Sequence, residues 1–333
     1  MAKPTIREVA KLAGVSVSVA SNALNNKGRV NIETRKRVKN VAQSLGYVPN
    51  YSAQRLRGEG GAVGVIVTDT LEDAPLERFV GESLYRFHHL TYDLGFKLHT
   101  IHLPSAAFNE ANLFDKLNDG TIDSAIFLVP RISQIEAIIN VMNQLNHMPH
   151  IFVSATPDFP TESYVDSDGR AGAAAAVRHL LDQGHTRIGY LMPSDGHDQF
   201  NALDRLHGAQ DEMQRSDLEL SIYYATHWEQ KISLEKILTD ENTAIIAWND
   251  IFALRVISKL HRMGLRVPQD IAVIGFDDEM FSKWTYPKIS TVSQPIANMS
   301  KAAIDYLIAR INTKESKVLR EKFPVQLIVR ESG

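Results

Sequence analysis

The sequence contains no cysteine, which excludes disulfides, thiolate metal sites and cysteine nucleophiles. No run of apolar residues approaches the roughly 18 that a membrane-spanning helix needs. The N-terminal residues also lack the apolar segment of a secretory signal, so we expect a cytosolic protein with no membrane partner. An apolar content of 44% and a charged content of 23% are those of a globular chain. Its 333 residues predict roughly two or three domains.

Motifs of the common enzyme classes are missing as well. The chain has no Gly-x-Ser-x-Gly elbow, no His-Glu-x-x-His and no phosphate-binding loop. Gly58, Gly60 and Gly61 precede a predicted strand instead of following one, so they indicate a flexible joint. His88 and His89 are adjacent and lack the helical spacing of metal ligands. We therefore expect no enzyme activity, no cofactor and no metal site.

Charge is distributed unevenly along the chain. The first sixty residues contain eleven Lys and Arg and three acids, a net charge of +8, whereas the whole chain has a net charge of −3. The remainder is therefore acidic, at −11. A basic segment of this kind is suited to a polyanion, although a solvated basic surface without a partner would have the same charge.

The pattern inside this basic segment predicts three short helices. The first begins at Thr5, with Glu8 at capping-box spacing, and ends at Gly14. Ser16 and Asn31 are N-caps for the second and third, and Gly46 ends the third. Apolar residues at helical spacing give each helix an inward face: Ile6, Val9, Ala10 and Ala13; Ala20, Ala23 and Leu24; Val38, Val41 and Leu45. The outward face of the third helix is basic, with Arg35, Lys36, Arg37 and Lys39.

Two short helices joined by a glycine turn and braced by a third are typical of a helix-turn-helix. The second helix would then enter the major groove of DNA, where each base pair presents a distinct edge. Asn22 is suited to adenine and Val17 to a thymine methyl group. Polar residues expected to reach phosphates or bases are Ser16, Ser18, Ser21 and Asn25. A small three-helix domain with a structural role would share the apolar spacing but would not need the basic charge.

From residue 62 onward, short β-rich runs alternate with amphipathic helical ones. Strands are predicted at 62–67, 97–102, 124–129, 150–153, 187–192, 220–225, 243–247 and 271–275. Continuous apolar strands with helical crossovers indicate an α/β fold of doubly wound parallel sheets. Two sheets, at 62–160 and 161–290, would form two lobes. The chain is then expected to cross back near residue 290 into a helix at 295–312, with a last strand at 322–330.

Polar residues follow several of these strands, where open α/β sheets bind their ligands. Asn249 and Asp277 follow the seventh and eighth strands, and Arg205 and Trp228 follow the fifth and sixth. Asp and Arg can clamp neighbouring hydroxyls, and an aromatic ring can cover a sugar face. Simpler roles also fit: Asn249 or Asp277 as a helix cap, Arg205 in a surface ion pair, Trp228 in the core.

Several long motifs resemble the lactose-repressor/galactose-repressor (LacI/GalR) family of bacterial transcription regulators. In the basic segment they are Thr-Ile-Arg-Glu-Val-Ala-Lys-Leu-Ala-Gly-Val-Ser at 5–16 and Val-Ala-Ser-Asn-Ala-Leu-Asn at 19–25. Leu-Gly-Tyr-Val-Pro-Asn at 45–50 and Ala-Gln-Arg-Leu at 53–56 continue the match. The remainder resembles the family's effector domain at 183–188, in Ala-Trp-Asn-Asp at 247–250, and at 264–278.

The resemblance implies a domain organisation. A helix-turn-helix DNA-binding domain is expected at 1–48, and a hinge helix and linker at 49–61. A two-lobed, periplasmic-binding-protein-like (type I) domain should follow. Its N-lobe is expected at 62–160 with 290–320, and its C-lobe at 161–289 with 321–333.

The resemblance also implies the function and its residues. The family suggests a homodimeric repressor of carbohydrate-utilisation genes that binds a palindromic operator in double-stranded DNA. A small-molecule effector would act in the interlobe cleft; a sugar is expected, and a nucleobase or nucleoside is the alternative. A free sugar-binding protein would lack the basic head. The implied DNA contacts add Thr5, Thr34, Asn50, Ala53 and the groove-wedging Leu56 to those above, and the implied effector contacts are Asp69, Arg205, Trp228, Asn249 and Asp277.

The sequence departs from the usual family pattern in two places. Members often have Thr-Val-Ser-Arg where residues 19–22 are Val-Ala-Ser-Asn. Asn22 therefore replaces a reader of guanine with one suited to adenine, and a different operator is expected. Trp248 stands where small residues are common, which predicts an altered pocket rim.

Overall fold

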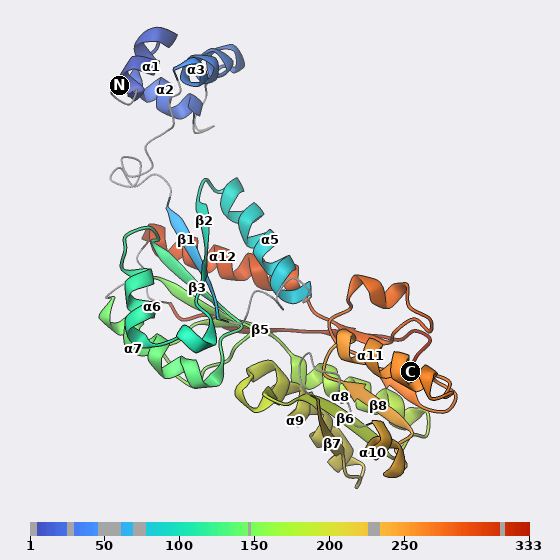
Figure 1. Ribbon diagram of the computed structural model, residues 1–333. Coiled ribbons are helices and arrows are strands. Elements are labelled where there is room, and N and C mark those ends of the chain that lie inside the picture. Colours follow the sequence, from blue (N-terminus) through green and yellow to red (C-terminus); the bar gives the residue numbers. More distant parts are fainter. Residues whose placement is uncertain are drawn as a thin grey trace. The chain divides into compact units, whose positions relative to one another are not determined.

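The computed structural model describes residues 5–24, 30–45, 61–68, 78–145, 148–225, 234–313 and 317–333. The chain divides into two compact units, Met1–Gly61 with Tyr92–Lys97, and Ala62–Thr91 with Leu98–Gly333. Each unit is described by itself below. Figure 1 gives the element labels used from here on.

The basic unit contains three helices, α1 (Ile6–Ala13), α2 (Val17–Leu24) and α3 (Ile32–Ser44). The predicted capping box is confirmed, because the Glu8 amide donates to Thr5 Oγ1 at 3.4 Å and the Thr5 amide donates to Glu8 Oε2 at 2.6 Å. Gly14 ends α1 with a φ of 64°, which glycine adopts without strain. Ser16 Oγ accepts from the Val19 amide at 3.2 Å, and Asn31 Oδ1 accepts from the Glu33 amide at 2.9 Å.

A small apolar core holds these three helices together. The predicted inward residues of α1 and α2 and Val38 of α3 are buried or pack against this core, together with Ala42. Arg37 adds a polar brace, because its Nε donates to the Ala13 carbonyl at 3.1 Å and so satisfies the last turn of α1. The three-helix head predicted from the sequence is confirmed.

The second unit begins with a six-stranded sheet. Its strands are β1 (Ala62–Val67), β2 (Lys97–His102), β3 (Ser124–Leu128), β4 (His150–Val153), β5 (Tyr164–Ser167) and β11 (Arg320–Phe323). They lie in the order β11-β5-β4-β3-β1-β2, and the pairs β1–β3, β3–β4, β4–β5 and β5–β11 are parallel. The residues of β3 are all buried, as expected of a parallel strand covered on both faces.

Four helices are connected to strands of this sheet. They are α5 (Arg78–Asp93), α6 (Glu110–Leu117), α7 (Ile135–Gln144) and α12 (Ile296–Thr313). One buried cluster joins Ile66, Phe127 and Phe152 of the sheet to apolar residues of α6 and α7. Helix α12 packs on β3, β4 and β5. We call this sheet and these helices the first lobe.

A four-stranded parallel sheet forms the second lobe. Its order is β7 (Ser221–Ala225), β6 (Ile188–Pro193), β8 (Ala244–Ala247) and β9 (Ala272–Ile274). Helix α8 (Gly169–Asp182) precedes β6 in the chain, and α9 (Phe200–Arg215), α10 (Leu234–Thr239) and α11 (Asp250–Arg262) lie between the strands of this sheet. A short antiparallel ribbon, β10 (Thr291–Ser293) with β12 (Gln326–Ile328), adjoins β9 through an isolated bridge from Ile274 to Ser290.

Close backbone approach fixes α8 against α9. A Cβ atom on Gly208 would lie 2.0 Å from the Arg170 carbonyl oxygen, so only glycine fits there without moving a helix. This contact positions the amino-terminal half of α9, which carries a predicted ligand residue.

Two details of the predicted topology change. The expected single strand at 322–330 is wrong: β11 pairs with β5 in the first lobe and β12 pairs with β10, with Pro324 and Val325 between them. Proline has no amide hydrogen for a strand ladder, so the break falls there. No strand was predicted at 164–167, which fall in the range expected to form the second lobe; these residues form β5, which joins the first sheet. The domain boundaries themselves stay a prediction.

Among the residues that the structure describes, no helix is both long and apolar enough to cross a membrane.

Candidate functional site

The predicted DNA-facing residues of α2 fall into two groups. Ser16, Val17 and Ser18 are exposed, with Val17 at 38%, and Asn22 is half-buried. Ser21 was expected on the same exposed face, and that placement is wrong because its exposed fraction is 8%. Helix α2 packs against both α1 and α3, so the buried part of its surface is wider than the row of apolar residues alone.

The other residues of the head that were predicted to contact DNA differ in their exposure. The Thr5 hydroxyl is already engaged with Glu8 in the capping box, and Thr34 is half-buried on α3. Lys36 and Lys39 on α3 are exposed, as predicted for a basic outer face. Asn25, Asn50, Ala53 and Leu56 lie outside the described residues, so the hinge and its wedge stay predictions.

In the second unit, two of the predicted effector-binding residues, Arg205 and Asp277, form an ion pair. Arg205 lies in the first half of α9 and is 3% exposed. Its Nη2 donates to Asp277 Oδ1 at 3.1 Å, and its Nη1 donates to the Trp248 carbonyl at 2.7 Å. The guanidinium carbon lies 3.7 Å from the centre of the Phe276 ring. The alternative of a surface ion pair for Arg205 is therefore wrong, since Arg205 itself is buried.

Asp277 is held in an unusual backbone conformation. Its φ is 105°, in a region that favours glycine, and that of Asp278 is 50°. The Asp277 amide donates to the Val292 carbonyl at 2.8 Å, and Oδ1 accepts from Gln294 Nε2 at 2.6 Å as well as from Arg205. Such backbone costs about 1–3 kcal/mol and persists where surrounding contacts impose it, often at functional sites.

Asn249 performs the structural role that was weighed for it. Its Oδ1 accepts from the Phe252 amide at 2.9 Å and so caps α11, and the residue is 4% exposed. Trp248 was expected to alter a pocket rim; instead its side chain is 4% exposed, lies in the core of the second lobe and packs edge-on against Phe252. Asp69 and Trp228 lie outside the described residues.

Several residues at this site were missed by the sequence analysis. Gln294 connects two segments, because its amide donates to Asp277 while its Oε1 accepts from Ser167 Oγ at 2.7 Å. Tyr190 of β6 is 1% exposed, and its hydroxyl has no hydrogen-bond partner among the described residues. Burial, and secondarily the charge of Asp277, raise its pKa. Gln294 directly follows the predicted crossover near residue 290, which could have indicated it.

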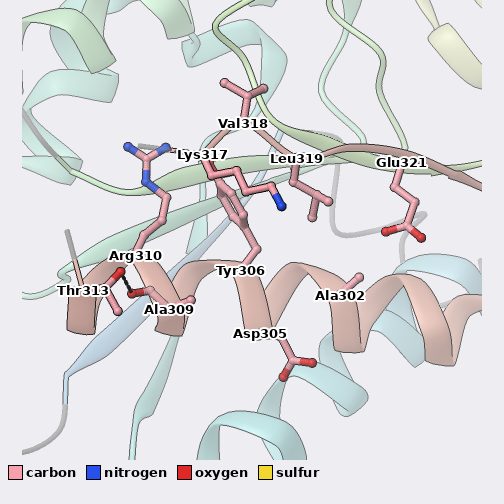
Figure 2. A pocket seen from close by; sticks show the side chains of 10 residues that line it. All are labelled: Ala302, Asp305, Tyr306, Ala309, Arg310, Thr313, Lys317, Val318, Leu319 and Glu321. Carbon is pink, nitrogen blue, oxygen red and sulfur yellow. Dashed lines mark hydrogen bonds between the residues drawn. The ribbon is translucent and has the colours of Figure 1, made fainter. Parts of the chain in front are cut away.

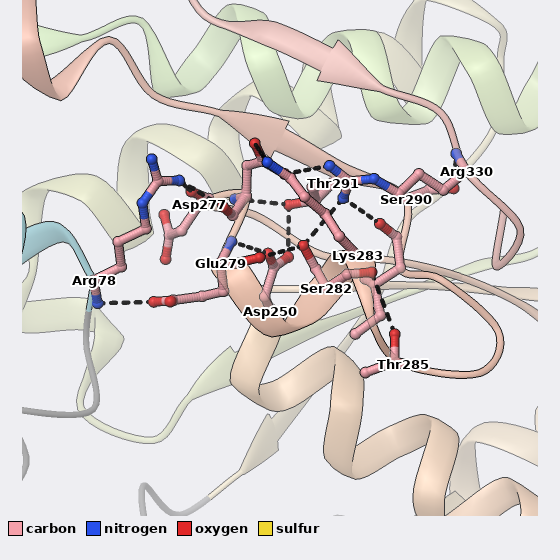
Figure 3. A network of polar contacts seen from close by, with 12 residues as sticks. Arg78, Asp250, Asp277, Glu279, Ser282, Lys283, Thr285, Ser290, Thr291 and Arg330 are labelled. Carbon is pink, nitrogen blue, oxygen red and sulfur yellow. Dashed lines mark hydrogen bonds and ion pairs between the residues drawn. The ribbon is translucent and has the colours of Figure 1, made fainter.

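Polar contacts between the two lobes surround these residues, and Figure 3 shows those made by Arg78. The Arg78 amide donates to Glu279 Oε1 at 2.7 Å, and its Nη1 donates to the Asp277 and Asp278 carbonyls at 3.0 and 2.5 Å. We call the place where the carboxyl ends of the strands of the two lobes meet the interlobe site.

A second set of contacts lies at the carboxyl ends of β3 and β6. Arg131 Nη1 pairs with Asp195 Oδ2 at 2.8 Å, and Ser133 donates twice to the Asp198 carboxylate, from its amide at 2.8 Å and from its hydroxyl at 2.7 Å. Phe200, at the start of α9, packs against the core cluster of the first lobe. The two lobes are thus connected near both ends of the interlobe site.

Buried carboxyl groups are a further feature of the interlobe site. Burial raises the pKa of Asp166 to about 7, and that of Glu279 to about 7. Asp250 is fully buried, and burial raises its pKa well above the usual range. Its oxygens accept from Thr291 Oγ1 at 2.6 Å and from the Glu279 amide at 2.7 Å (Figure 3). A Cβ atom on Gly275 would lie 2.1 Å from Asp250 Oδ1, so glycine leaves room for this carboxyl group.

We expect Asp166→Asn to stabilise the protein at pH 8, with little effect near pH 4. The folded chain retains the Asp166 proton up to about pH 7, whereas the unfolded chain loses it near pH 4. Between those values ionisation of Asp166 in the unfolded chain progressively favours unfolding, by up to roughly 4 kcal/mol above pH 7, and Asn cannot ionise. Urea unfolding at both pH values measures this, with the exposed Asp305→Asn as control; an equal effect at pH 4 and pH 8 would contradict it.

A separate groove lies away from the interlobe site. Its volume is about 320 Å³, and it is formed between α12 and residues 317–321 (Figure 2). Tyr306, Arg310 and Leu319 are among its lining residues. It borders the amino ends of β5 and β11, whereas ligands of parallel sheets bind at the carboxyl ends. Within the described residues, no three His, Asp or Glu side chains are grouped as ligands of a metal ion.

Comparison with known proteins agrees with both units. The family "Bacterial regulatory proteins, lacI family" matches residues 5–50, and the "Periplasmic binding protein-like domain" matches residues 177–333. The HTH-type transcriptional regulator GalR of Escherichia coli is 29% identical over 338 residues, covering 98% of this chain and 95% of GalR. The repressor PurR of Aliivibrio salmonicida is 26% identical over 336 residues and covers 98% of both chains.

Solved structures share the fold over the whole chain. The lac repressor dimer bound to operator and the anti-inducer ONPF has a TM-score of 0.81 at 22% identity, covering 99% of each chain. A complex of the transcriptional regulator CelR with cellobiose has a TM-score of 0.74 at 24% identity, covering 99% of this chain and 100% of CelR. With its three-helix helix-turn-helix head and its two parallel α/β lobes, the chain belongs to the LacI/GalR family of DNA-binding transcriptional regulators, which are not enzymes.

Proposed function

We propose that the protein is a homodimeric repressor of carbohydrate-utilisation genes, released from or fixed on a palindromic operator by a sugar at the interlobe site. The observation that carries the proposal is the buried Arg205–Asp277 pair at the carboxyl end of β9, in a chain headed by a helix-turn-helix. Charged groups held in this way are suited to clamp neighbouring hydroxyls. Action on operator DNA would place the protein in the cytoplasm.

Relatives of the same fold support a sugar. One solved structure is a complex with cellobiose, another contains bound ribose and a third D-xylulofuranose. A nucleobase or nucleoside is the second candidate, because repressors named PurR match the chain over nearly its whole length and Arg and Asp also hydrogen-bond bases.

The proposed mechanism links the two sites through the hinge. A homodimer would place two α2 helices in successive major grooves, about 34 Å apart, and Leu56 from each hinge would wedge into the minor groove. An effector favours whichever arrangement of the lobes binds it more tightly, and its effect equals that difference in affinity, typically about 1–3 kcal/mol. Movement of the lobes would break the hydrogen bonds that Arg78 donates to Glu279 and to the Asp277 carbonyl.

Residues 280–286 are our candidate for part of the dimer interface. They contain three large exposed apolar side chains, with exposed fractions of 64% for Met280, 74% for Trp284 and 89% for Tyr286. Apolar side chains concentrated in this way commonly mark a protein interface, and aromatic residues contribute most of its binding energy.

Trp284→Ala combined with Tyr286→Ala is expected to shift the protein toward the monomer, because the double variant removes two aromatic anchors. The dimer dissociation constant should rise at least roughly tenfold, as measured by sedimentation. Tyr224→Ala, which removes a 58%-exposed tyrosine on β7, is the matched control and should leave the constant unchanged. A double variant as dimeric as the parent would remove residues 280–286 from the interface.

Asn22→Ala is expected to relax base preference at one position of each half-site. A bidentate amide contact to adenine discriminates by about 1–3 kcal/mol. The comparison variant is Lys36→Ala, which should weaken binding to all sequences alike and reduce its salt dependence. Affinities for operators substituted at each base pair separate the two patterns; uniform weakening by Asn22→Ala would show that it does not read a base.

A thermal-shift screen against sugars and nucleobases tests the effector half of the proposal. A ligand at 100 times its dissociation constant adds about 2.7 kcal/mol of stability. The hit is then added to an operator-binding assay, where tighter or weaker binding identifies a corepressor or an inducer. The absence of any hit across sugars and nucleobases would count against a small-molecule effector at this site.

A further inference from the structure

We propose that the interlobe site selects uncharged polyhydroxylated effectors and rejects their phosphorylated or carboxylated forms. This inference rests on the proposed function, since it concerns the charge of the effector that would bind there. It follows from how the basic and acidic groups at the site are already bonded.

The basic side chains described at the interlobe site are occupied by acids of the chain itself. Arg205 pairs with Asp277, and Arg78 Nε pairs with Glu82 at 2.8 Å. The other pairs are Arg131–Asp195 at 2.8 Å, Lys322–Asp204 at 3.1 Å and Arg330–Asp278. Recognition of a phosphate or carboxylate requires an Arg or Lys that can turn to the ligand. Here each such contact would have to displace an existing partner.

Arg205 is the strongest case, because its guanidinium is fixed on three sides. One Nη binds Asp277, the other binds the Trp248 carbonyl, and the Phe276 ring covers a face at 3.7 Å. Its Nε is buried and has no hydrogen-bond partner among the described residues. The guanidinium of Arg205 therefore cannot offer two parallel N–H groups to an anion, whereas single N–H groups can still donate to a neutral ligand oxygen.

The acids of the site exceed its bases. Asp166, Asp250 and Glu279 are all buried, and none of them forms an ion pair within the described part of the chain. Instead they accept from backbone amides or a hydroxyl: Ser167 N at 2.8 Å, Glu279 N at 2.7 Å with Thr291 Oγ1 at 2.6 Å, and Arg78 N at 2.7 Å.

At pH 8, above the pKa of about 7 of Asp166 and Glu279, an anionic ligand would place its charge beside these two carboxylates, where burial weakens screening by solvent. A polyol meets the same groups favourably, because each hydroxyl can donate to a carboxylate oxygen. Asp277 Oδ1 already accepts two hydrogen bonds, whereas Oδ2 accepts none from the described residues. The unpartnered Tyr190 hydroxyl is 1% exposed and could serve as a donor to a neutral ligand oxygen once the lobes part.

Matched pairs of free and phosphorylated sugars test the inference on the full-length protein. The probes are glucose, fructose and ribose, each with its phosphate ester, together with gluconate and cellobiose, measured by calorimetry at pH 8. We expect at least one free sugar to bind, and its phosphorylated form to bind roughly 100-fold more weakly, because juxtaposed like charges are costly. An ester or gluconate that binds as tightly as the free sugar, or more tightly, would overturn the inference and leave the proposed sugar effector intact.

Two variants attribute the discrimination to the carboxyl groups. Asp166→Asn and Asp277→Asn keep the side-chain shape and remove one charge, so the ratio of affinities for sugar and ester should fall at least tenfold in one of them. Asp305→Asn, on the exposed face of α12, is the control and should keep the parent ratio. An unchanged ratio in both variants would overturn the electrostatic argument, and no binding of any sugar or ester would instead refute the proposed sugar effector on which the inference rests.

Discussion

Arg205→Ala is expected to lower the free energy of unfolding of the effector domain by about 3 kcal/mol and to abolish effector binding. Arg205 is buried and Asp277 is half-buried, with exposed fractions of 4% and 14% for the two side chains. Removing one partner of such a pair leaves the other charge unpaired in a poorly solvated place, which costs about 3–5 kcal/mol. The Trp248 carbonyl loses its donor in the same change.

Chemical unfolding measures the loss of stability, and two further variants test whether it comes from the Arg205–Asp277 pair. Arg187→Ala breaks a pair with Glu241 whose side chains are 57% and 72% exposed, and it should cost less than about 1 kcal/mol. Adding Asp277→Ala to Arg205→Ala should recover part of the stability, because it removes the unpaired charge. A loss for Arg205→Ala no greater than that of the exposed control would show that the pair is not buried in solution.

Asp277→Ala is expected to abolish the effector response while operator binding in the absence of effector stays normal. The carboxylate would supply charge-assisted hydrogen bonds to ligand hydroxyls, worth about 1.5–3 kcal/mol each, so effector affinity should fall at least roughly tenfold. The head that would bind DNA is a separate compact unit and does not contain this residue.

The response is measured by titrating effector into the complex of the protein with its operator. Asp277→Asn, which keeps the contact with Gln294 and removes the charge, should give an intermediate response. An Asp277→Ala protein that responds at the same effector concentration as the parent would remove Asp277 from the binding site. Loss of operator binding without effector would instead indicate a damaged fold.

Features that depend on neighbouring residues in the chain were predictable from the sequence. The capping box of Thr5 and Glu8, the turn at Gly14 and the N-cap at Ser16 each involve groups within three residues of one another or a single backbone angle. The strand at 62–67 was also predictable, because a continuous apolar run is typical of a buried parallel strand.

Features set by packing between distant elements were not predictable in this way. Ser21 is buried because α2 contacts two helices, and helical spacing alone assigned it to the exposed face. Gln294 and Ser167 are 127 residues apart, and only the crossing of the chain between lobes joins them. Arg205 and Asp277 were each expected to face the effector, but no local pattern at either residue predicts that the two form an ion pair.

Selection of operator sequences from a random pool of duplex DNA, with and without the effector found by thermal shift, tests the central claim most directly. We expect the purified protein to enrich a palindromic site with half-sites about one helical turn apart, and the effector to change affinity for that site by roughly 5- to 150-fold. Enrichment of no common sequence, or of a palindrome whose affinity is the same with and without effector, would contradict the account of an effector-controlled DNA-binding regulator.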